Sequence, residues 1–455
     1  MKTPYFLLLS FLFSFNLQAQ EAITYQKPPQ EILELIDIER APSVFSDSTK
    51  QTMLLVYRDQ YKSIAALSAK EMRLAGLRIN PKTNIGSRTT YYNNIRVLDV
   101  KTQRISDIKD LPEEARLANI TWSHDEQKVA FTHTTETGVE LWYADLSSHQ
   151  AHRLTEPRLN ANMRSVARWF KDDKALLVKF LPADRKALID PMDAVPTGPT
   201  VSNSDGSKAQ NRTYQDLLKN PNDEFNFEQL AHAELVKVSL KGKTKPWLPS
   251  AMYTSIDFSP DGKYVSVTQV KRPFSYLVPY RRFLQQTDIY QANGKHVSLF
   301  NQVPLSEEIP KGFMATREGR RNLQWRADQP ATMVWAEALD GGDPENQVPF
   351  RDEVFQVKAP FKAQPESLFK TKDRFYQITW GDENHAIFYD YWWNTRQIRT
   401  SLFDPANLDQ DVVELNVRNY QEVYSDPGNF VTTRNHLGED VLLLDKQHAY
   451  LMGDG

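Results

Sequence analysis

A strand–turn–strand phrase that recurs along the chain is the feature that most restricts its fold. The clearest copy is YTSIDFSPDGKYVSVT at 253–268. Its first six residues alternate as in a strand, and SPDG then reverses the chain, because proline presets φ and glycine accepts positive φ. The β-branched residues that follow predict a returning strand.

Related phrases begin at Val44, Ile120, Val166, Ile256, Leu323, Ile378 and Val431. Most of them carry Trp or Phe before the turn, and we expect these rings to pack between neighbouring sheets: Trp122, Phe170, Phe258, Trp325 and Trp380. Such a repeat is typical of a propeller of four-stranded blades. We therefore predict an all-β fold, a seven-bladed β-propeller over residues 43–455, with two stacked β-sandwiches as the alternative. Because the sequence stops soon after strand-like residues at 441–444 and 450–452, we expect the last blade to be truncated.

The N-terminus has the pattern of a targeting segment. Lys2 precedes the apolar run YFLLLSFLFSF at 5–15, and Ala19 offers a small residue for cleavage. This pattern predicts a signal peptide over 1–19, with a short membrane anchor as the alternative. Export of a large chain that has no cysteine favours a bacterial periplasmic protein. Residues 20–42 form an N-terminal segment, in which a short helix is expected before Pro42.

Two insertions interrupt the repeat, at 69–92 and 182–228. The first is polar and rich in arginine, and the second contains a predicted short helix around Tyr214 to Leu218. Long loops of this kind are usually functional or disordered.

The sequence contains no recognisable catalytic or metal-binding motif. None of its 17 glycines is followed two positions later by serine, as a hydrolase nucleophile turn requires, and no phosphate-binding loop occurs. His149 and His152 lie in a polar stretch without a matching carboxylate motif. The net charge of −3, with both signs mixed, gives no support to nucleic acid or an acidic membrane as partner. We predict no catalytic residue, cofactor or metal within these residues.

Irregular phrases spread over the chain resemble those of another group of proteins. They are YQKPPQEILELI (25–36), LAGLRI (74–79), SR (87–88), TYQDLL (213–218), RPFSYLVPYRRF (272–283), WRAD (325–328), WAE (335–337), DGGD (340–343) and YSDPG (424–428). In this respect the chain is similar to the N-terminal part of glutamyl endopeptidases of the prolyl oligopeptidase family of serine peptidases.

The resemblance implies a propeller that restricts access to an α/β-hydrolase domain with a Ser-Asp-His triad and helps to bind peptide. That domain would follow the propeller and is absent from this sequence, so no triad residue can be assigned. The expected function is therefore that of a substrate-gating, peptide-binding propeller of an exported peptidase that cleaves after Glu. Its partners would be a peptide substrate and the hydrolase domain. A stand-alone periplasmic module that binds a peptide or protein is the alternative, and an unusual active site on the propeller itself is a third possibility.

A peptidase that selects acidic side chains needs a fixed cation, and arginine offers a bidentate fork to carboxylate. Arg272, Arg281 and Arg282 are the first candidates, because they lie among aromatic residues directly after a predicted strand. Arg78 and Arg88 in the first insertion are the second choice. Alternatively, these arginines cap blade loops or pair with Asp257 and Asp261.

Overall fold

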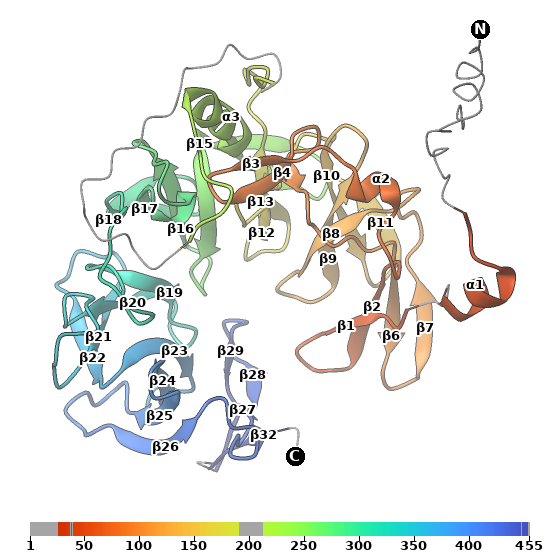
Figure 1. Cartoon of the computed structure of the whole chain (residues 1–455). Helices are drawn as coiled ribbons and strands as arrows, with labels where there is room; N and C mark the ends of the chain where they lie inside the picture. Colours follow the sequence, from red (N-terminus) through yellow and green to blue (C-terminus); the bar gives the residue numbers. More distant parts are fainter. Residues whose placement is uncertain (1–25, 37, 39, 191–212, 447, 454–455) are drawn as a thin grey trace, which may run out of the picture.

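The computed structural model describes residues 26–453, except 37, 39, 191–212 and 447. In this part of the chain, antiparallel sheets follow one another around an axis (Figure 1). The chain is thus an all-β propeller, as the repeated phrase predicts. The expected signal peptide, at 1–19, lies outside the described residues.

Six four-stranded arrays of strands make up the ring of the described residues. The first sheet holds, in spatial order, β1 (Ser43–Ser46), β2 (Thr52–Tyr57), β6 (Asn94–Asp99) and β7 (Arg104–Asp107). The second holds β8 (Leu117–Trp122), β9 (Lys128–Thr134), β10 (Val139–Asp145) and β11 (Gln150–Arg153). The fifth holds β19 (Arg321–Trp325), β20 (Thr332–Ala338), β21 (Asp352–Lys358) and β22 (Glu366–Thr371). The sixth holds β23 (Arg374–Trp380), β24 (Ala386–Trp392), β25 (Gln397–Phe403) and β26 (Val413–Asn419).

The third and fourth sheets share one long strand, β15 (Thr244–Phe258). Its residues 244–251 pair with β14, and its residues 252–258 pair with β16. The third sheet thus comprises β12 (Ala167–Trp169), β13 (Ala175–Phe180), β14 (Ala233–Ser239) and the first part of β15. The fourth comprises the rest of β15 with β16 (Tyr264–Lys271), β17 (Leu284–Gln291) and β18 (His296–Val303). One strand is therefore the outer strand of one blade and the inner strand of the next.

The seventh repeat forms only short strand pairs in the described residues. They are β27 (Asn429–Phe430) with β32 (Leu451–Met452), β28 (Thr432–Arg434) with β29 (Asp440–Leu442), and β30 (Leu444–Asp445) with β31 (His448–Ala449). A seventh four-stranded sheet is not seen there, so the number of blades stays a prediction.

Apolar side chains pack between neighbouring sheets, which gives the ring its core. Phe170 and Phe258, from the turn ends of the third and fourth sheets, meet edge to face with ring centroids 5.0 Å apart. Another cluster joins Leu176 and Val178 of the third sheet to Leu141 of the second. Each fully buried aliphatic side chain contributes roughly 1.5–3 kcal/mol. The aromatic residue before the turn therefore packs between sheets here, as expected.

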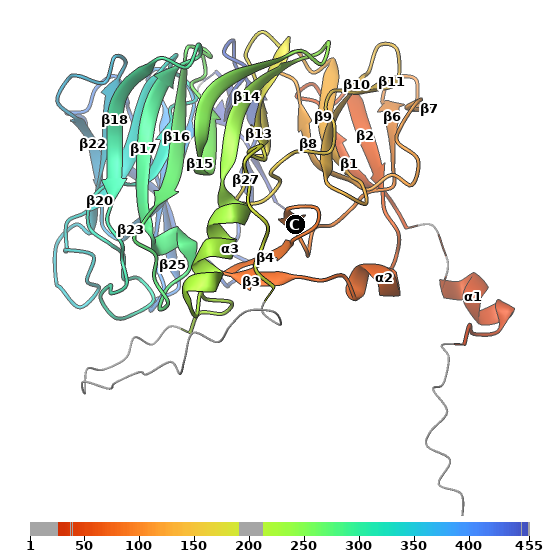
Figure 2. The same ribbon diagram turned by 90° about the horizontal axis from the view of Figure 1, so that it is seen from above.

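The two ends of the ring differ in their loops. Short turns join the first and second strands of each sheet at one end, which we call the tight-turn face. The connections between the second and third strands lie at the other end, the loop face, and carry the insertions (Figure 2). These hold α2 (Ile64–Leu67), β3 (Met72–Leu74), β4 (Leu77–Asn80), β5 (Ile85–Gly86), α3 (Pro221–Ala231) and the 3-10 turn η1 (Tyr280–Arg282). The N-terminal helix α1 (Gln30–Ile36) lies outside the ring, close to its expected position.

The helix predicted around Tyr214 to Leu218 is not there. Those residues are irregular, and the helix α3 begins at Pro221. Asn220 caps it, because the Asn220 side-chain oxygen accepts a hydrogen bond from the Asp223 backbone N–H (2.9 Å). Proline at the first helical position is also a typical start. The Asn-Pro pair was the signal that the sequence prediction missed.

The insertions of the loop face share one apolar core. Phe227 of α3 is fully buried and meets Phe274 and Phe283 edge to face, at centroid distances of 5.2 and 5.9 Å. Met72 and Leu74 of β3 belong to the same cluster. The first insertion is therefore held on the ring by the second insertion and by the 272–283 connection.

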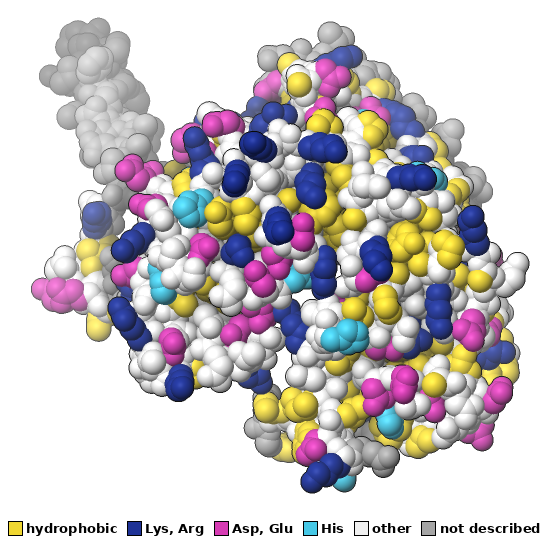
Figure 3. Space-filling model, turned by 180° about the vertical axis from the view of Figure 1, so that it is seen from behind, with side chains coloured by type: hydrophobic (Ala, Val, Ile, Leu, Met, Phe, Trp, Pro, Cys, Tyr) yellow, Lys and Arg dark blue, Asp and Glu magenta, His cyan; other side chains and the backbone are white. Residues whose placement is uncertain are grey.

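Turns of neighbouring sheets are tied together on the tight-turn face. Ser48 Oγ donates to Glu126 Oε2 (2.7 Å), and the Asp261 N–H donates to the Pro330 carbonyl (3.0 Å). Figure 3, which shows the molecule from behind relative to Figure 1, displays this face with cationic and anionic side chains mixed across it.

The hairpin of β28 and β29 reaches across this face. It touches turns of the second, third and fifth sheets through three contacts: Arg434 Nη1 to Glu126 Oε1 (2.6 Å), Lys171 Nζ to the Leu437 carbonyl, and Asn435 Nδ2 to the Ala327 carbonyl (2.9 Å). Because these sheets lie at different points around the ring, the tip of the hairpin lies across the axis.

Candidate functional site

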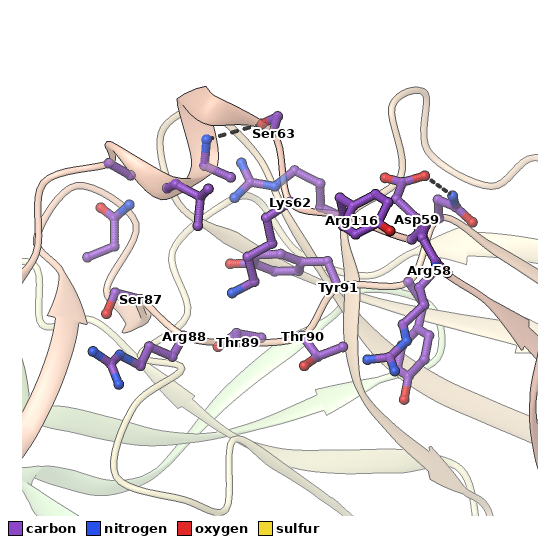
Figure 4. Close-up of a pocket in the computed structure, with 18 of the residues that line it drawn as sticks. Arg58, Asp59, Lys62, Ser63, Ser87, Arg88, Thr89, Thr90, Tyr91 and Arg116 are labelled. Carbon is purple, nitrogen blue, oxygen red and sulfur yellow. Dashed lines mark hydrogen bonds between the residues drawn. The ribbon is translucent and has the colours of Figure 1, made fainter. Parts of the chain in front are cut away.

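A cationic cavity opens in the loop face, beside the first insertion. Its volume is about 920 Å³. The walls come from the segment that follows β2, from α2, from the residues after β5 and from the residues before β8 (Figure 4). The first sheet and its insertion thus supply most of the lining.

Local hydrogen bonds hold these segments in place. Ser63 caps α2 by accepting the Ala66 N–H at its side-chain oxygen (3.1 Å). Beyond β5, the Thr89 hydroxyl donates to the Gly86 carbonyl (2.7 Å), and the Ser87 hydroxyl donates to Glu71 Oε2 (2.6 Å). The chain from 86 to 90 therefore runs along the cavity in a defined path.

Cations outnumber carboxylates in the lining. The cations are Arg40, Arg58, Lys62, Arg73, Arg88 and Arg116, and the carboxylates are Asp59 and Glu71. Arg73 Nε contacts Glu71 Oε1 at 2.7 Å, so these two charges compensate each other. The hydrogen bond from Ser87 is the main reason that the pKa of Glu71 lies below its usual value, and Arg73 lowers it further. Glu71 thus stays ionised and engaged at neutral pH.

Every cation of the lining except Arg73 lacks a carboxylate partner among the described residues. Arg58, Lys62 and Arg88 form no hydrogen bond or ion pair with any residue that the structure describes, and Figure 4 shows them around the cavity. The guanidinium of Arg116 lies over the Tyr91 ring, 4.6 Å from its centroid, which leaves its charge uncompensated. Unpaired guanidinium and ammonium groups beside hydroxyl side chains are suited to binding an anion.

Of the five arginines proposed from the sequence, Arg88 lies in this cavity. Arg78, from the same insertion, turns away from it and binds Asp216, with Nε 2.5 Å from Oδ2. This hydrogen bond raises the pKa of Arg78. Arg78 therefore ties the first insertion to the second, and a substrate-binding role for it stays a prediction.

Arg272 is held by two carboxylates of α3. Its Nη1 lies 2.7 Å from Glu224 Oε2, and its Nε lies 2.7 Å from Glu228 Oε1. The guanidinium also lies over the Phe274 ring, at 4.5 Å. The hydrogen bond to Glu228 is the main cause that raises the pKa of Arg272. Its partners are thus on α3 rather than the suggested Asp257 or Asp261, which lie near Arg168 (3.8 Å) and Lys263 (3.5 Å).

Arg281 and Arg282 form the 3-10 turn η1, on another part of the loop face. Both line a smaller cavity of about 180 Å³, together with Arg317. Arg281 is exposed, and the Arg282 guanidinium lies 5.3 Å from the centroid of the Tyr214 ring. Of the five sequence candidates, Arg88 therefore lies in the larger cavity, and Arg281 and Arg282 line the smaller one. The other two, Arg78 and Arg272, form ion pairs.

Sequence reasoning missed Arg58, Lys62 and Arg116. The first insertion begins directly after β2, at Arg58, earlier than the expected start at residue 69. Lys62 directly precedes the helix cap Ser63, and that Ser could have indicated an ordered element there. Arg116 and Asn93 both line the cavity, although a whole strand pair separates them in the sequence, so only the fold brings their two segments together.

Metal-ligand clusters and long apolar helices are both missing from the described residues. They contain no group of three or more His, Asp or Glu side chains arranged to hold a metal ion. No helix in that part of the chain has the length and apolar character needed to span a bilayer.

Comparisons with known proteins give relatives in plants. The chain is 34% identical over 450 residues to a protein of Oryza sativa subsp. japonica named "Probable glutamyl endopeptidase, chloroplastic", covering 95% of this chain and 48% of that protein. An Arabidopsis thaliana protein of the same name is 34% identical over 434 residues, covering 92% and 45%. The chain spans about half the length of the curated relatives it matches. No protein-family model matches it.

Solved structures overlap with the chain more weakly. The match to a prolyl endopeptidase structure covers 92% of this chain and 47% of that structure's chain, with 13% identity and a TM-score of 0.43. The acylaminoacyl peptidase of Pyrococcus horikoshii covers 84% and 46%, with 12% identity and a TM-score of 0.39. Overlaps at this level carry no inference about function. The identity over nearly the whole chain shows that it is related to proteins named as glutamyl endopeptidases, which supports the kinship with the prolyl oligopeptidase family expected from the sequence.

Proposed function

We propose that this chain is the peptide-binding, substrate-gating propeller of a serine peptidase that cleaves after Glu. The observation that carries the proposal is the cavity in which Arg58, Lys62 and Arg88 lack a carboxylate partner among the described residues. The names of the relatives agree with it, because a peptidase that selects Glu must offer cations to a side-chain carboxylate.

Recognition of Glu follows from the chemistry of the lining. A guanidinium binds both oxygens of a carboxylate through two parallel N–H donors, and such charge-assisted contacts contribute roughly 1.5–3 kcal/mol. Glutamine has the same shape but no charge, and its amide N–H₂ would face the cations. The hydroxyls of Thr89 and Thr90 can hydrogen-bond to the peptide backbone beside the carboxylate.

The catalytic half of the proposed peptidase is an α/β-hydrolase domain that supplies the Ser-Asp-His triad. We propose that it packs against the loop face, where large apolar side chains are exposed, among them Leu277 and Phe313. With the cavity on that same face, the propeller would hold an acidic peptide on the side where the bond is cut. Export to the bacterial periplasm, indicated by the N-terminal pattern, is part of the proposal.

The test compares two peptides that differ only in Glu against Gln, each with a reduced bond after that residue so that it cannot be cleaved. Their affinities for the purified full-length protein are measured by fluorescence anisotropy. We expect the Glu peptide to bind about tenfold tighter or more, since a charge-assisted contact is gained. Arg88→Met should remove most of this difference. Lys241→Met, an exposed lysine on the tight-turn face, serves as the matched control. Equal affinities for the two peptides in the unmodified protein would refute the proposal.

A further inference from the structure

The charge and size of the cavity exceed what one Glu side chain requires. Six cations and two carboxylates line it. Because Glu71 is compensated by Arg73, the remaining carboxylate is Asp59, which accepts a hydrogen bond from the Asn93 amide (2.7 Å) and stands beside five other cations. One bound carboxylate would therefore leave most of the positive charge without a counterion.

The unpaired cations stand on two separate segments, with Arg58 and Lys62 on the connection between β2 and α2 and Arg88 on the residues after β5. A single carboxylate is small enough to be held by one guanidinium fork, whereas the cations here are distributed around a volume of about 920 Å³. That volume is in the range of cavities that bury a ligand of several residues or a drug-sized molecule.

We propose that this cavity binds a run of acidic residues in a peptide, with several carboxylates engaged at once, in addition to any single Glu at the cleaved bond. The inference rests on the proposed peptide-binding function and deepens it, because it names the substrate class. Polypeptides with clustered Asp and Glu are then the preferred substrates. Arg58, Lys62 and Arg88 each take one carboxylate, and the hydroxyl side chains contact the backbone between them.

Three labelled peptides of equal length test the inference on the full-length protein. They carry one Glu, three consecutive Glu, or three Gln in otherwise identical sequences, with reduced bonds at the possible cleavage positions. We expect the triple-Glu peptide to bind at least tenfold tighter than the single-Glu peptide. Its affinity should also fall more steeply as salt is raised, because more charges are screened.

Variants assign the effect to the cavity. Arg58→Met and Lys62→Met should each bring the triple-Glu affinity toward that of the single-Glu peptide, by about threefold to tenfold. Lys241→Met and Lys243→Met, two exposed lysines on the opposite face, should leave it within twofold. Because Lys62 is also exposed, its replacement leaves the fold intact, which thermal unfolding of the variant verifies.

The outcomes separate this inference from the proposed function. If the single-Glu peptide binds tighter than its Gln counterpart but three Glu bind no tighter than one, the inference is overturned and the proposed function stands. If three Glu bind tightly while one Glu equals Gln, the proposed selection of a single Glu fails and the inference stands. Displacement of the triple-Glu peptide by equimolar pyrophosphate would overturn the inference in favour of a small phosphate ligand.

Discussion

A buried lysine in the third sheet shows how far a single residue can depart from its ordinary behaviour. Lys179 is 1% exposed, and its ammonium donates to the carbonyls of Asn162 (2.5 Å) and Tyr253 (3.5 Å). Burial away from water lowers the pKa of Lys179 from 10.5 to about 7, and the positive charge of Arg168 adds to this effect.

The pH dependence of stability follows from that shift. Between about pH 7 and pH 10.5 the unfolded chain holds a proton at Lys179 that the folded chain has lost. Stability therefore rises with pH in this window, by about 1.4 kcal/mol per pH unit for this one group. In Lys179→Met this rise should be missing, so the free energy of unfolding of the wild-type protein should increase relative to that of the variant as the pH increases.

Urea unfolding of both proteins at pH 7.5, 8.5 and 9.5 measures the difference directly. Other titrating groups affect the two proteins equally and cancel in the comparison. If the free energies of unfolding of wild type and variant, plotted against pH, stay parallel over this window, Lys179 keeps its ordinary pKa.

Arg272 illustrates what can and what cannot be predicted for a residue from its sequence context. The aromatic phrase around it correctly indicated a specific interaction, but the partners, Glu224 and Glu228, lie on a helix that the sequence reasoning placed elsewhere. The Arg-rich first insertion likewise pointed to Arg88, whereas Arg58 and Arg116 join it only through the fold.

Replacing Arg272 by Gln should therefore act on stability more than on binding. The side chain is half exposed, so loss of its two ion pairs should cost about 1 kcal/mol. Affinity for the Glu peptide should stay within twofold. Denaturant unfolding and fluorescence anisotropy on the same variant distinguish a role in stability from a role in binding. A tenfold loss of affinity with unchanged stability would support the substrate-binding role predicted from the sequence.

At the scale of elements, the repeated phrase predicted the inner strands well. All seven positions fall on or beside a strand, because alternating apolar residues and a short polar turn fix the local geometry. The sharing of β15 between two sheets could not be predicted, since it depends on pairing with partners that lie far apart along the chain. The short pairs after β26 lie where a truncated last blade was expected.

The β28–β29 hairpin should be anchored mainly by its charged contact. Arg434 binds Glu126, which also accepts a hydrogen bond from Ser48, and both charged side chains are more than two-thirds buried. Arg434→Met should destabilise the protein by about 2 kcal/mol, the typical contribution of a hydrogen bond between charged groups. Hydrogen exchange should then accelerate selectively at 432–442.

An exposed pair provides the control for this experiment. Lys82 lies 3.5 Å from Glu136, and both side chains are largely exposed, so Lys82→Met should change stability by less than about 1 kcal/mol. Equal exchange at the hairpin in Arg434→Met and in the unmodified protein would mean that apolar contacts with the sixth sheet, such as the cluster that joins Val441 to Trp380, anchor it instead.

For the whole molecule, the contrast between the two faces is the guiding observation. On the tight-turn face, turns of neighbouring sheets are tied together, whereas the loop face carries the insertions, the cationic cavity and the exposed Leu277 and Phe313. Large apolar side chains that gather on one face commonly mark an interaction surface. This asymmetry supports the proposal that a hydrolase domain packs on the loop face.

Charges introduced on the loop face should uncouple cleavage from binding in the proposed full-length peptidase. Leu277 is 65% exposed and Phe313 is 76% exposed, so Leu277→Asp and Phe313→Asp disturb the fold of the propeller little. In contact with another domain, a buried carboxylate without a partner is strongly unfavourable. Cleavage after Glu should therefore fall at least tenfold, whereas the affinity of the uncleavable Glu peptide stays within twofold. Leu299→Asp, a similarly exposed residue on the outer strand β18, is the control. Unchanged cleavage in both loop-face variants would place the hydrolase domain on another part of the ring.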